Sequence, residues 1–293
     1  MNKPIKIMFT DIWFKDPNNN RFINKFRQDF GFDVEIDSNN PDYILYSIGG
    51  DSYKKYTNAK KIFICWEPIN IKNDIRLLTC DYSVTYYSDL EDNIKHFYFT
   101  PIIEKSGFAE NFIESINKPL LINKQKFCCF IISNGSCNDR NNFFKKLCFY
   151  KKVDSFGGVM KNCDVIIPSR NEGWDREYLN VIGEYKFMIT FENNLNNGVI
   201  TEKIYNAFKA NTVPIYWGNK EIYKIFNKGS FINVHDFSNF EGVIEYIKKV
   251  DNDDNLYNEI LNSVKLNNDS NFFKEKTKNM WEKIFYPNSD IAK

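Results

Sequence analysis

Short apolar runs alternate with amphipathic segments along most of the chain, and this alternation is the strongest signal in the sequence. In the first third, strand-like runs are bounded by polar turns, and the clearest helix-like segment between them is 21–30. The strand-like runs lie at 5–10, 33–36, 42–48, 60–67, 82–87 and 96–103. Strands that alternate with helices predict an α/β domain built on a mainly parallel sheet.

A second alternating series extends from 126 to 250. The segment between the two series has weaker periodicity and contains Gly107 and Pro119. We therefore predict two doubly wound, Rossmann-like domains that face a cleft, at 1–118 and 119–293. A final amphipathic helix is expected at about 270–286, packed on one of the domains and able to cross back to the first. The residues near one face of this helix are Phe273, Thr277, Met280, Trp281 and Ile284.

The composition indicates a globular protein with little net charge. Of 293 residues, 43% are hydrophobic, and 39 Lys and Arg balance 38 Asp and Glu, which argues against a nucleic-acid or anionic-membrane partner. Seven Cys form no CxxC pair, as expected of reduced thiols in an intracellular chain. Neither a signal peptide nor an apolar run of about 18 residues is evident, so we expect a cytoplasmic protein.

Glu67 is the last residue of the strand-like run "IFICWE", and Pro68 follows it. In open α/β sheets ligands bind beyond the carboxyl ends of the strands, so a carboxylate here is expected at a binding cleft. Partial desolvation between Trp66 and Pro68 would suit Glu67 to general-base catalysis. The alternative interpretation is that Glu67 is an ordinary surface Glu at the end of a strand, without a catalytic role.

Arg140 and Lys203 share one unusual position, the first turn of a helix that follows a strand. Asn138 or Asp139 can cap the first helix, and Thr201 can cap the second. A cation in the first turn opposes the helix dipole, whereas a bound anion would stabilise both the cation and the helix end. Two such cations in one domain favour a nucleotide diphosphate as ligand, and solvated side chains at a mild cost are the alternative.

Two polar residues near Lys203 can contact the same ligand. The Glu202 carboxylate can accept hydrogen bonds from ribose or sugar hydroxyls, or serve only as a favourable first-turn charge. Asn193, at the end of the run "ITFEN", can reach the ligand or merely form a turn.

Other motifs carry less information. His96 and His235 are the two histidines and lie far apart in the sequence, so neither a metal site nor a His-based triad is supported. The acidic segment 251–255 is expected to be a solvated loop. Gly pairs at 49–50 and 157–158 follow strands and allow close backbone approach, but neither a GxGxxG nor a P-loop motif is present.

The stretch from 191 to 219, "FENNLNNGVITEKIYNAFKANTVPIYWGN", closely resembles the α1,3/α1,4-fucosyltransferase family. The family signature is carried by Phe-Glu-Asn at 191–193, Thr-Glu-Lys at 201–203 and the run at 212–218. Bacterial members are similar over most of the chain. The segment 58–68 resembles the strand that ends in their catalytic Glu, and 230–248 resembles the region after their donor motif.

The resemblance implies a GT-B fold with an N-terminal acceptor domain, a C-terminal domain for GDP-fucose and inversion at the fucose anomeric carbon. Glu67 then matches the general base. Arg140 and Lys203 match the cations that bind the diphosphate, and Asn193 and Glu202 match donor-contacting positions. No chelated metal is required for this chemistry, although a divalent ion can stimulate it.

Thr201 and Val199 are expected to contact the donor as well. Val199 and Ile200 stand where bacterial members often carry an aromatic residue, so another GDP-sugar or a non-GlcNAc acceptor is an alternative. A non-catalytic nucleotide-sugar or glycan-binding protein is a second alternative, but pure binding does not need a base such as Glu67. The heptad repeats and basic tail of some bacterial members are not visible, and peripheral membrane contact and oligomeric state stay open.

Overall fold

A computed structural model describes residues 3–12, 20–67, 69–99, 116, 124–166, 174–196 and 198–287. The chain forms two compact units, Met1–Glu110 with Ser270–Lys293, and Asn111–Asp269. The predicted boundary between 118 and 119 falls outside the described residues. The last helix, α10 (Ser270–Phe285), belongs to the first unit.

The first unit is built on a parallel sheet of six strands in the order β2-β1-β3-β4-β5-β6. Its strands are β1 (Ile5–Thr10), β2 (Val34–Ile36), β3 (Tyr43–Tyr46), β4 (Lys60–Cys65), β5 (Tyr82–Thr85) and β6 (His96–Tyr98). All six coincide with predicted strand-like runs. The chain reverses direction across the sheet between β1 and β3, as in doubly wound folds.

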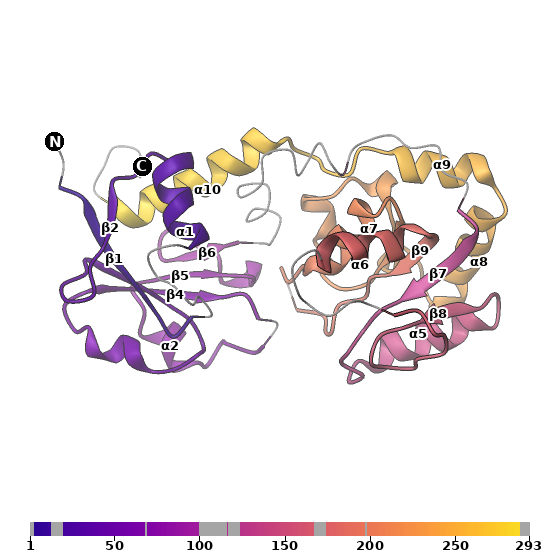
Figure 1. Cartoon of the computed structure of the whole chain (residues 1–293), viewed down its shortest axis with the longest axis horizontal. Coiled ribbons are helices and arrows are strands. Elements are labelled where there is room, and N and C mark those ends of the chain that lie inside the picture. Colours follow the sequence, from indigo (N-terminus) through magenta and orange to yellow (C-terminus); the bar gives the residue numbers. More distant parts are fainter. Residues whose placement is uncertain are drawn as a thin grey trace. The chain divides into compact units, whose positions relative to one another are not determined.

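Helices of the first unit cover the sheet on both faces. They are α1 (Arg21–Asn24), a π-helical turn at Lys25–Asp29, α2 (Ile75–Leu78), α10, and 3₁₀ turns at Ser52–Lys55 and Ser88–Leu90. The α10 helix lies alongside α1 (Figure 1), where Trp281 packs edge-on against Phe26 with ring centroids 4.8 Å apart. On the other face, Tyr46 stacks on Tyr53 at 4.1 Å.

The five residues predicted to share one face of the last helix are all buried: Phe273, Thr277, Met280, Trp281 and Ile284. This confirms the predicted amphipathic stripe. Because that stripe contacts the first unit, α10 closes the apolar side of a sheet whose other strands come from the first hundred residues.

The second unit is built on a parallel sheet of five strands in the order β11-β10-β9-β7-β8. Its strands are β7 (Lys126–Phe130), β8 (Val153–Ser155), β9 (Tyr185–Ile189), β10 (Val213–Tyr216) and β11 (Ile232–Asn233). Its helices are α5 (Asn138–Cys148), α6 (Trp174–Gly183), α7 (Glu202–Lys209), α8 (Phe240–Asp251) and α9 (Asp254–Asn262). Short 3₁₀ turns lie at Ile222–Lys224, Lys228–Ser230 and Val234–Asp236.

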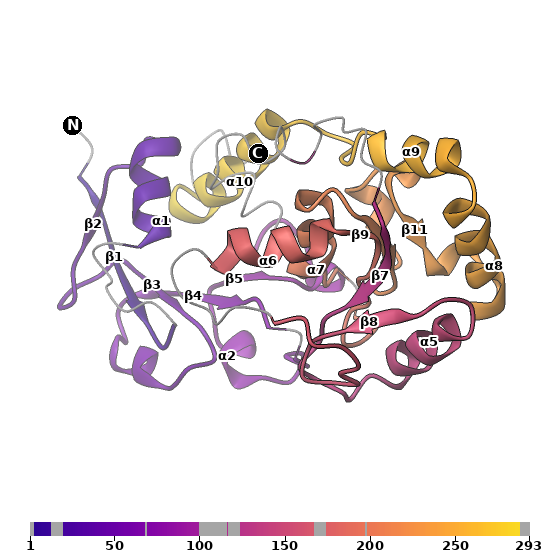
Figure 2. The ribbon, with the colours of Figure 1, turned by 45° about the vertical axis from the view of Figure 1, so that its right-hand side comes forward.

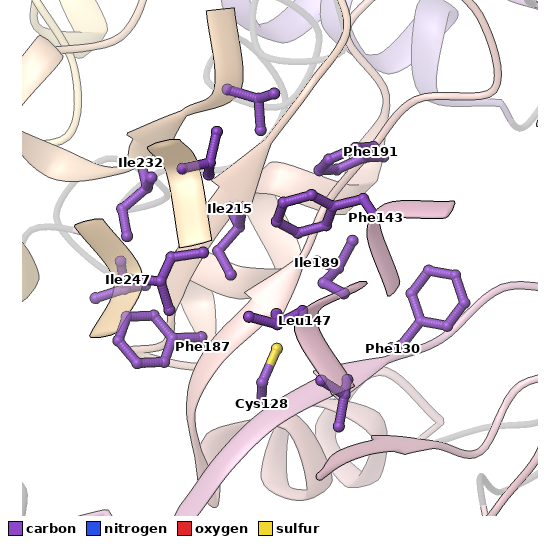
Figure 3. Close-up of a cluster of buried hydrophobic side chains, with 14 of the residues drawn as sticks. Cys128, Phe130, Phe143, Leu147, Phe187, Ile189, Phe191, Ile215, Ile232 and Ile247 are labelled. Carbon is purple, nitrogen blue, oxygen red and sulfur yellow. The ribbon is translucent and has the colours of Figure 1, made fainter. Parts of the chain in front are cut away.

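Successive residues of the central strands face opposite sides of this sheet. Cys128 and Phe187 belong to a cluster with residues of α5, α8 and α9, whereas their neighbours Cys129 and Met188 pack against α6 and α7. Figure 3 shows the first cluster, with Leu147 of α5 among the strand side chains. The helices α8 and α9 lie on the same side of the unit (Figure 2). Both units therefore confirm the predicted α/β class.

All seven cysteines are free thiols, which agrees with the predicted reduced thiols, and five of them are buried. Within the described ranges, no helix combines the length and apolar character needed to cross a bilayer.

The acidic segment 251–255 agrees only in part with the solvated loop that we predicted, because residues 252–255 are exposed but the segment contains the end of α8 and the start of α9. Asp251 ends α8 with its side chain only 3% exposed, and Asp253 caps α9 by accepting hydrogen bonds from Asn255 N and Leu256 N. The Asp251 carboxylate accepts bonds from Tyr150 Oη at 2.9 Å, Lys151 Nζ at 3.0 Å and Lys186 Nζ at 3.2 Å. It thereby ties α8 to the starts of β8 and β9.

We expect Asp251→Asn to lower the free energy of unfolding by about 3 kcal/mol at neutral pH, because it leaves the mostly buried Lys186 without its closest carboxylate. Burial raises the pKa of Asp251, but the hydrogen bonds from Lys151 and Tyr150 and the charge of Lys186 lower that pKa by more. Urea unfolding of both proteins between pH 3 and pH 7 measures the difference.

A lowered carboxyl pKa means that the unfolded chain binds more protons near the ordinary Asp pKa of about 4. The stabilisation by Asp251 is therefore complete above that pH and is lost as the pH falls through its folded-state pKa. Asp254→Asn is the control, since Asp254 also approaches Lys186, at 3.7 Å, but is 90% exposed. Equal effects of the two substitutions would contradict the assignment.

Candidate functional site

The second unit has a topological switch point between β7 and β9. From β7 the chain moves to β8 on one side, and from β9 it moves to β10 and β11 on the other. At such a point the loops after the two strands diverge and leave room for a ligand beyond their carboxyl ends. Arg140 follows β7 in α5, and residues 191–193 follow β9, so both border this position.

Arg140 is fully buried in the first turn of α5. One guanidinium nitrogen, Nη1, donates to Asn193 Oδ1 at 2.7 Å and to Phe191 O at 3.4 Å, while Nη2 donates to Asn134 O. Its Nε has no hydrogen-bond partner among the described residues. Burial lowers the pKa of Arg140, against the opposing effects of Cys137 and Glu192, but an Arg side chain stays protonated at neutral pH.

The predicted N-cap of α5 is wrong, and that of α7 is right in position but makes no side-chain cap. Cys137 occupies the N-cap position of α5 without a side-chain cap, and Arg140 instead donates back to the loop before the helix. Thr201 stands at the N-cap of α7 as expected, but its hydroxyl does not accept from the helix backbone. It donates to Glu192 Oε2 at 2.7 Å. Tertiary contacts have therefore replaced local capping at both helix starts.

Lys203 lies in the first turn of α7 with its side chain 17% exposed. Its Nζ donates to Glu192 Oε2 at 3.1 Å and to Thr201 Oγ1 at 2.9 Å. The charge that opposes the helix dipole is thus compensated by a buried carboxylate. Glu192 was not singled out in the sequence, although it is the central residue of the Phe-Glu-Asn run at the end of "ITFEN".

The three residues 191–193 bring the two predicted cations together. Phe191 O and the Asn193 side chain hold Arg140, and Glu192 between them holds Lys203. Two cations and one carboxylate leave a net positive charge at the switch point. Such an arrangement is suited to bind an anion with more than one negative charge, because each cation can contribute a charge-assisted hydrogen bond.

The other predicted donor contacts lie near Lys203 in the chain and differ in exposure. Glu202 is exposed in the first turn of α7, and Asn193 and Thr201 are half-buried. Val199 is 1% exposed, so its side chain packs in the interior of the unit. Of these residues, only Asn193 and Thr201 contact one of the two cations directly.

The paired glycines allow loops to approach one another, as predicted. A Cβ atom on Gly157 would clash with the backbone of Ile132, which joins the loops after β8 and β7. In the first unit, a Cβ on Gly49 would lie 2.7 Å from Asp11 O. In both places the close neighbour is the protein's own backbone.

Glu67 follows β4 in the first unit, two residues beyond its last strand position. The predicted partial burial is wrong: Trp66 is buried, but the Glu67 side chain is exposed. Trp66 takes the interior position by stacking on Phe22 at 5.4 Å, and the chain then turns, with Ile69 N donating to Glu67 O at 2.8 Å. The turn directs the carboxylate to solvent.

Comparisons with known proteins agree with this arrangement. The model of glycosyltransferase family 10 (fucosyltransferase), C-terminal part, matches residues 121–283, more than half of the chain. The model of the α-(1,3)-fucosyltransferase FucT N-terminal domain matches residues 7–101. The two models together take in Glu67, Arg140 and Lys203.

Individual relatives match a shorter part. The α-(1,3)-fucosyltransferase FucT of Helicobacter pylori is 37% identical over 144 residues, which are 49% of this chain and 28% of that protein. GDP-fucose protein O-fucosyltransferase 3 of Xenopus laevis is 36% identical over 124 residues, 41% of this chain and 26% of that protein. The matched segments thus span about a quarter of the length of these relatives.

A crystal structure of an α1,3-fucosyltransferase with GDP-fucose resembles the whole chain. The similarity covers 98% of this chain and 91% of that chain, with a TM-score of 0.72 and 23% sequence identity. The two units, each with its parallel sheet, therefore form a fold of the GT-B type.

Proposed function

The chain belongs to glycosyltransferase family 10, the fucosyltransferases, and on that basis we propose that it transfers L-fucose from GDP-fucose to a GlcNAc-containing glycan in α1,3 linkage. The observation that carries the proposal is the pair of cations held by residues 191–193 at the switch point. A nucleotide diphosphate supplies the charge that this site lacks. The names of the H. pylori relative and of the N-terminal family model support the α1,3 linkage.

In this proposal Arg140 and Lys203 bind the diphosphate of the donor. As the bond between the fucose anomeric carbon and the diphosphate oxygen breaks, that oxygen keeps the electron pair and GDP gains negative charge. Fixed cations stabilise this developing charge more than they stabilise the intact donor. Asn193 orients Arg140, and Glu202, exposed beside Lys203, is assigned to the sugar or ribose hydroxyls.

Glu67 is proposed as the general base. It accepts the proton of the acceptor hydroxyl while that oxygen forms a bond to the anomeric carbon from the face opposite the leaving GDP, which inverts the configuration. The exposed carboxylate of Glu67 is accessible to an acceptor glycan.

Transfer should proceed without a divalent metal, because Arg140 and Lys203 stabilise the negative charge of the diphosphate, as a metal ion does at other diphosphate sites. We expect the initial rate with GDP-fucose to be undiminished in excess EDTA, compared with the same assay without a chelator. Full loss of activity in EDTA and its recovery with Mg²⁺ or Mn²⁺ would contradict this part of the proposal.

The acceptor decides between the leading proposal and a second one. The relatives named protein O-fucosyltransferase 3 favour a protein hydroxyl as an alternative acceptor. Transfer from GDP-fucose to an array of glycans and to folded protein domains separates the two. We expect products on GlcNAc-containing glycans, and a panel with GDP-mannose and UDP-sugars tests the donor. Preference for another donor, or GDP binding without any transfer, would overturn the leading proposal.

We also propose that the protein acts in the cytoplasm. The seven free thiols, five of them buried, support a reducing compartment. Peripheral membrane contact is compatible with this location.

A further inference from the structure

Glu192 is a buried, hydrogen-bonded carboxylate that lies just beyond the end of β9. It is 1% exposed, and its two oxygens accept three hydrogen bonds from two residues of the α7 start. Thr201 N donates to Oε1 at 2.8 Å, and Oε2 accepts from the Thr201 hydroxyl at 2.7 Å and from Lys203 Nζ at 3.1 Å. Glu192 therefore fixes both where α7 begins and where the Lys203 side chain points.

The surroundings of Glu192 leave it little freedom. Gly218, after β10, lies directly against it, and a Cβ atom there would come within 2.6 Å of Glu192 Cγ and 2.7 Å of Tyr216 Oη. The backbone of Gly218 is in turn close to the His235 ring, whose Nε2 lies 2.9 Å from Gly218 O. In addition, Glu192 N donates to Trp217 O at 2.8 Å. The two residues that follow β10 therefore fix Glu192: Trp217 through the backbone of Glu192, and Gly218 through the Glu192 side chain.

The Lys203 ammonium group can still bind a ligand while it is hydrogen-bonded to Glu192 and Thr201. An ammonium group has three protons, and Glu192 and Thr201 accept two of them among the described residues. The side chain is 17% exposed, so the third proton can reach a ligand. An anion that instead displaced Glu192 would leave a buried carboxylate without its cation, which is costly. Joining the existing pair is the more favourable mode of binding.

We propose that Glu192 is a positioning residue: it holds Lys203, through the Thr201–Lys203 start of α7, in the orientation in which the ammonium group stabilises the leaving nucleoside diphosphate. This inference rests on the proposed function. Glu192 has two opposed effects on the ligand, since it orients a cation but also repels the diphosphate through its own negative charge. Loss of the Glu192 charge should therefore lower the catalytic rate, because Lys203 is no longer oriented, without weakening the binding of the diphosphate.

Glu192→Gln tests this role. The amide keeps the size of the side chain but replaces one acceptor oxygen with an NH₂ group, so it cannot hold both Thr201 and Lys203. We expect kcat for transfer from GDP-fucose to fall about a hundredfold, because a misplaced charge no longer matches the transition state. The affinity for GDP, measured by calorimetry with GDP alone, should stay equal to wild type or become tighter.

Two comparisons make the test specific. Glu184→Gln is the matched control, since Glu184 pairs with Lys126 in the same unit but its side chain is 55% exposed, and this variant should behave as wild type. In a Lys203→Met background, Glu192→Gln should cause no further loss of kcat, because its effect acts through Lys203. An additional loss in that background would overturn the proposal, as would wild-type kcat in the single variant.

Gly218→Ala provides a second route if Glu192→Gln does not fold. The added methyl group displaces the Glu192 side chain without removing its charge. We expect the same separation, with kcat reduced and GDP affinity retained. Wild-type kcat in folded Gly218→Ala would overturn the proposal. Failure of the wild-type protein to bind GDP would instead overturn the proposed function, so the two failures are distinguishable.

Discussion

Glu67→Gln is expected to abolish measurable fucose transfer while GDP binding stays at the wild-type affinity. Glutamine keeps the size of the side chain but cannot accept a proton, and a positioned general base contributes roughly 10²–10⁴-fold to the rate. Glu67 belongs to the first unit, whereas the two cations assigned to the diphosphate belong to the second. Initial rates with GDP-fucose and a GlcNAc-containing glycan, together with calorimetry with GDP, measure both quantities.

The exposure of Glu67 makes this test clean, because the substitution removes no buried contact and should leave the melting temperature unchanged. Glu35→Gln is the matched control, as Glu35 is a half-exposed carboxylate on the edge strand β2 of the same sheet. Undiminished turnover in Glu67→Gln, or loss of GDP binding in it, would defeat the assignment of the base.

The main features of the fold could be predicted because they depend on local patterns. Parallel strands buried on both faces appear as short apolar runs, and the last helix shows its buried stripe at helical spacing. The runs at 60–67 and 186–193 correspond to β4 and β9. Where tertiary contacts override a local preference, the prediction failed: Asp251 looks like part of a polar loop until Lys151 and Lys186 surround it.

In the candidate site, too, some features could be predicted from the sequence and others depend on tertiary contacts. The positions of Arg140 and Lys203 at helix starts follow from sequence, since each lies just after a strand and a polar turn. The partner of Lys203 does not, because Glu192 reaches it only when the loop between β9 and α7 folds back on the strand end. The sequence did contain one signal for this pair: Glu192 lies in an apolar run that ends in a turn. A carboxylate in such a run is rarely buried without a partner, so a nearby cation could have been expected.

Arg140→Met is expected to weaken GDP binding at least about a hundredfold, which corresponds to about 3 kcal/mol. Arg140 is a fully buried cation, it has no ion-pair partner among the described residues, and its Nε has no hydrogen-bond partner there. A bound diphosphate would supply both. The measurement is calorimetric titration with GDP, supported by urea unfolding with and without the nucleotide.

The unfolding experiment also distinguishes a ligand-binding Arg from a structural one. Without GDP, loss of the hydrogen bonds from Arg140 to Asn193 and to the Asn134 carbonyl destabilises the variant, but removal of a buried charge offsets this. We expect a net change of about 2 kcal/mol or less. At a GDP concentration one hundred times the wild-type Kd, the wild type gains about 2.7 kcal/mol, whereas a variant with hundredfold weaker binding gains about 0.4 kcal/mol.

A structural role for Arg140 makes the opposite prediction, namely a large loss of stability in the free protein and the same gain from GDP in both proteins. Arg176→Met, which removes an exposed Arg from α6 of the same unit, controls for the general loss of positive charge and should retain the wild-type gain. Arg140 is a buried cation that has no ion-pair partner among the described residues, so a bound anion explains its burial better than the fold does.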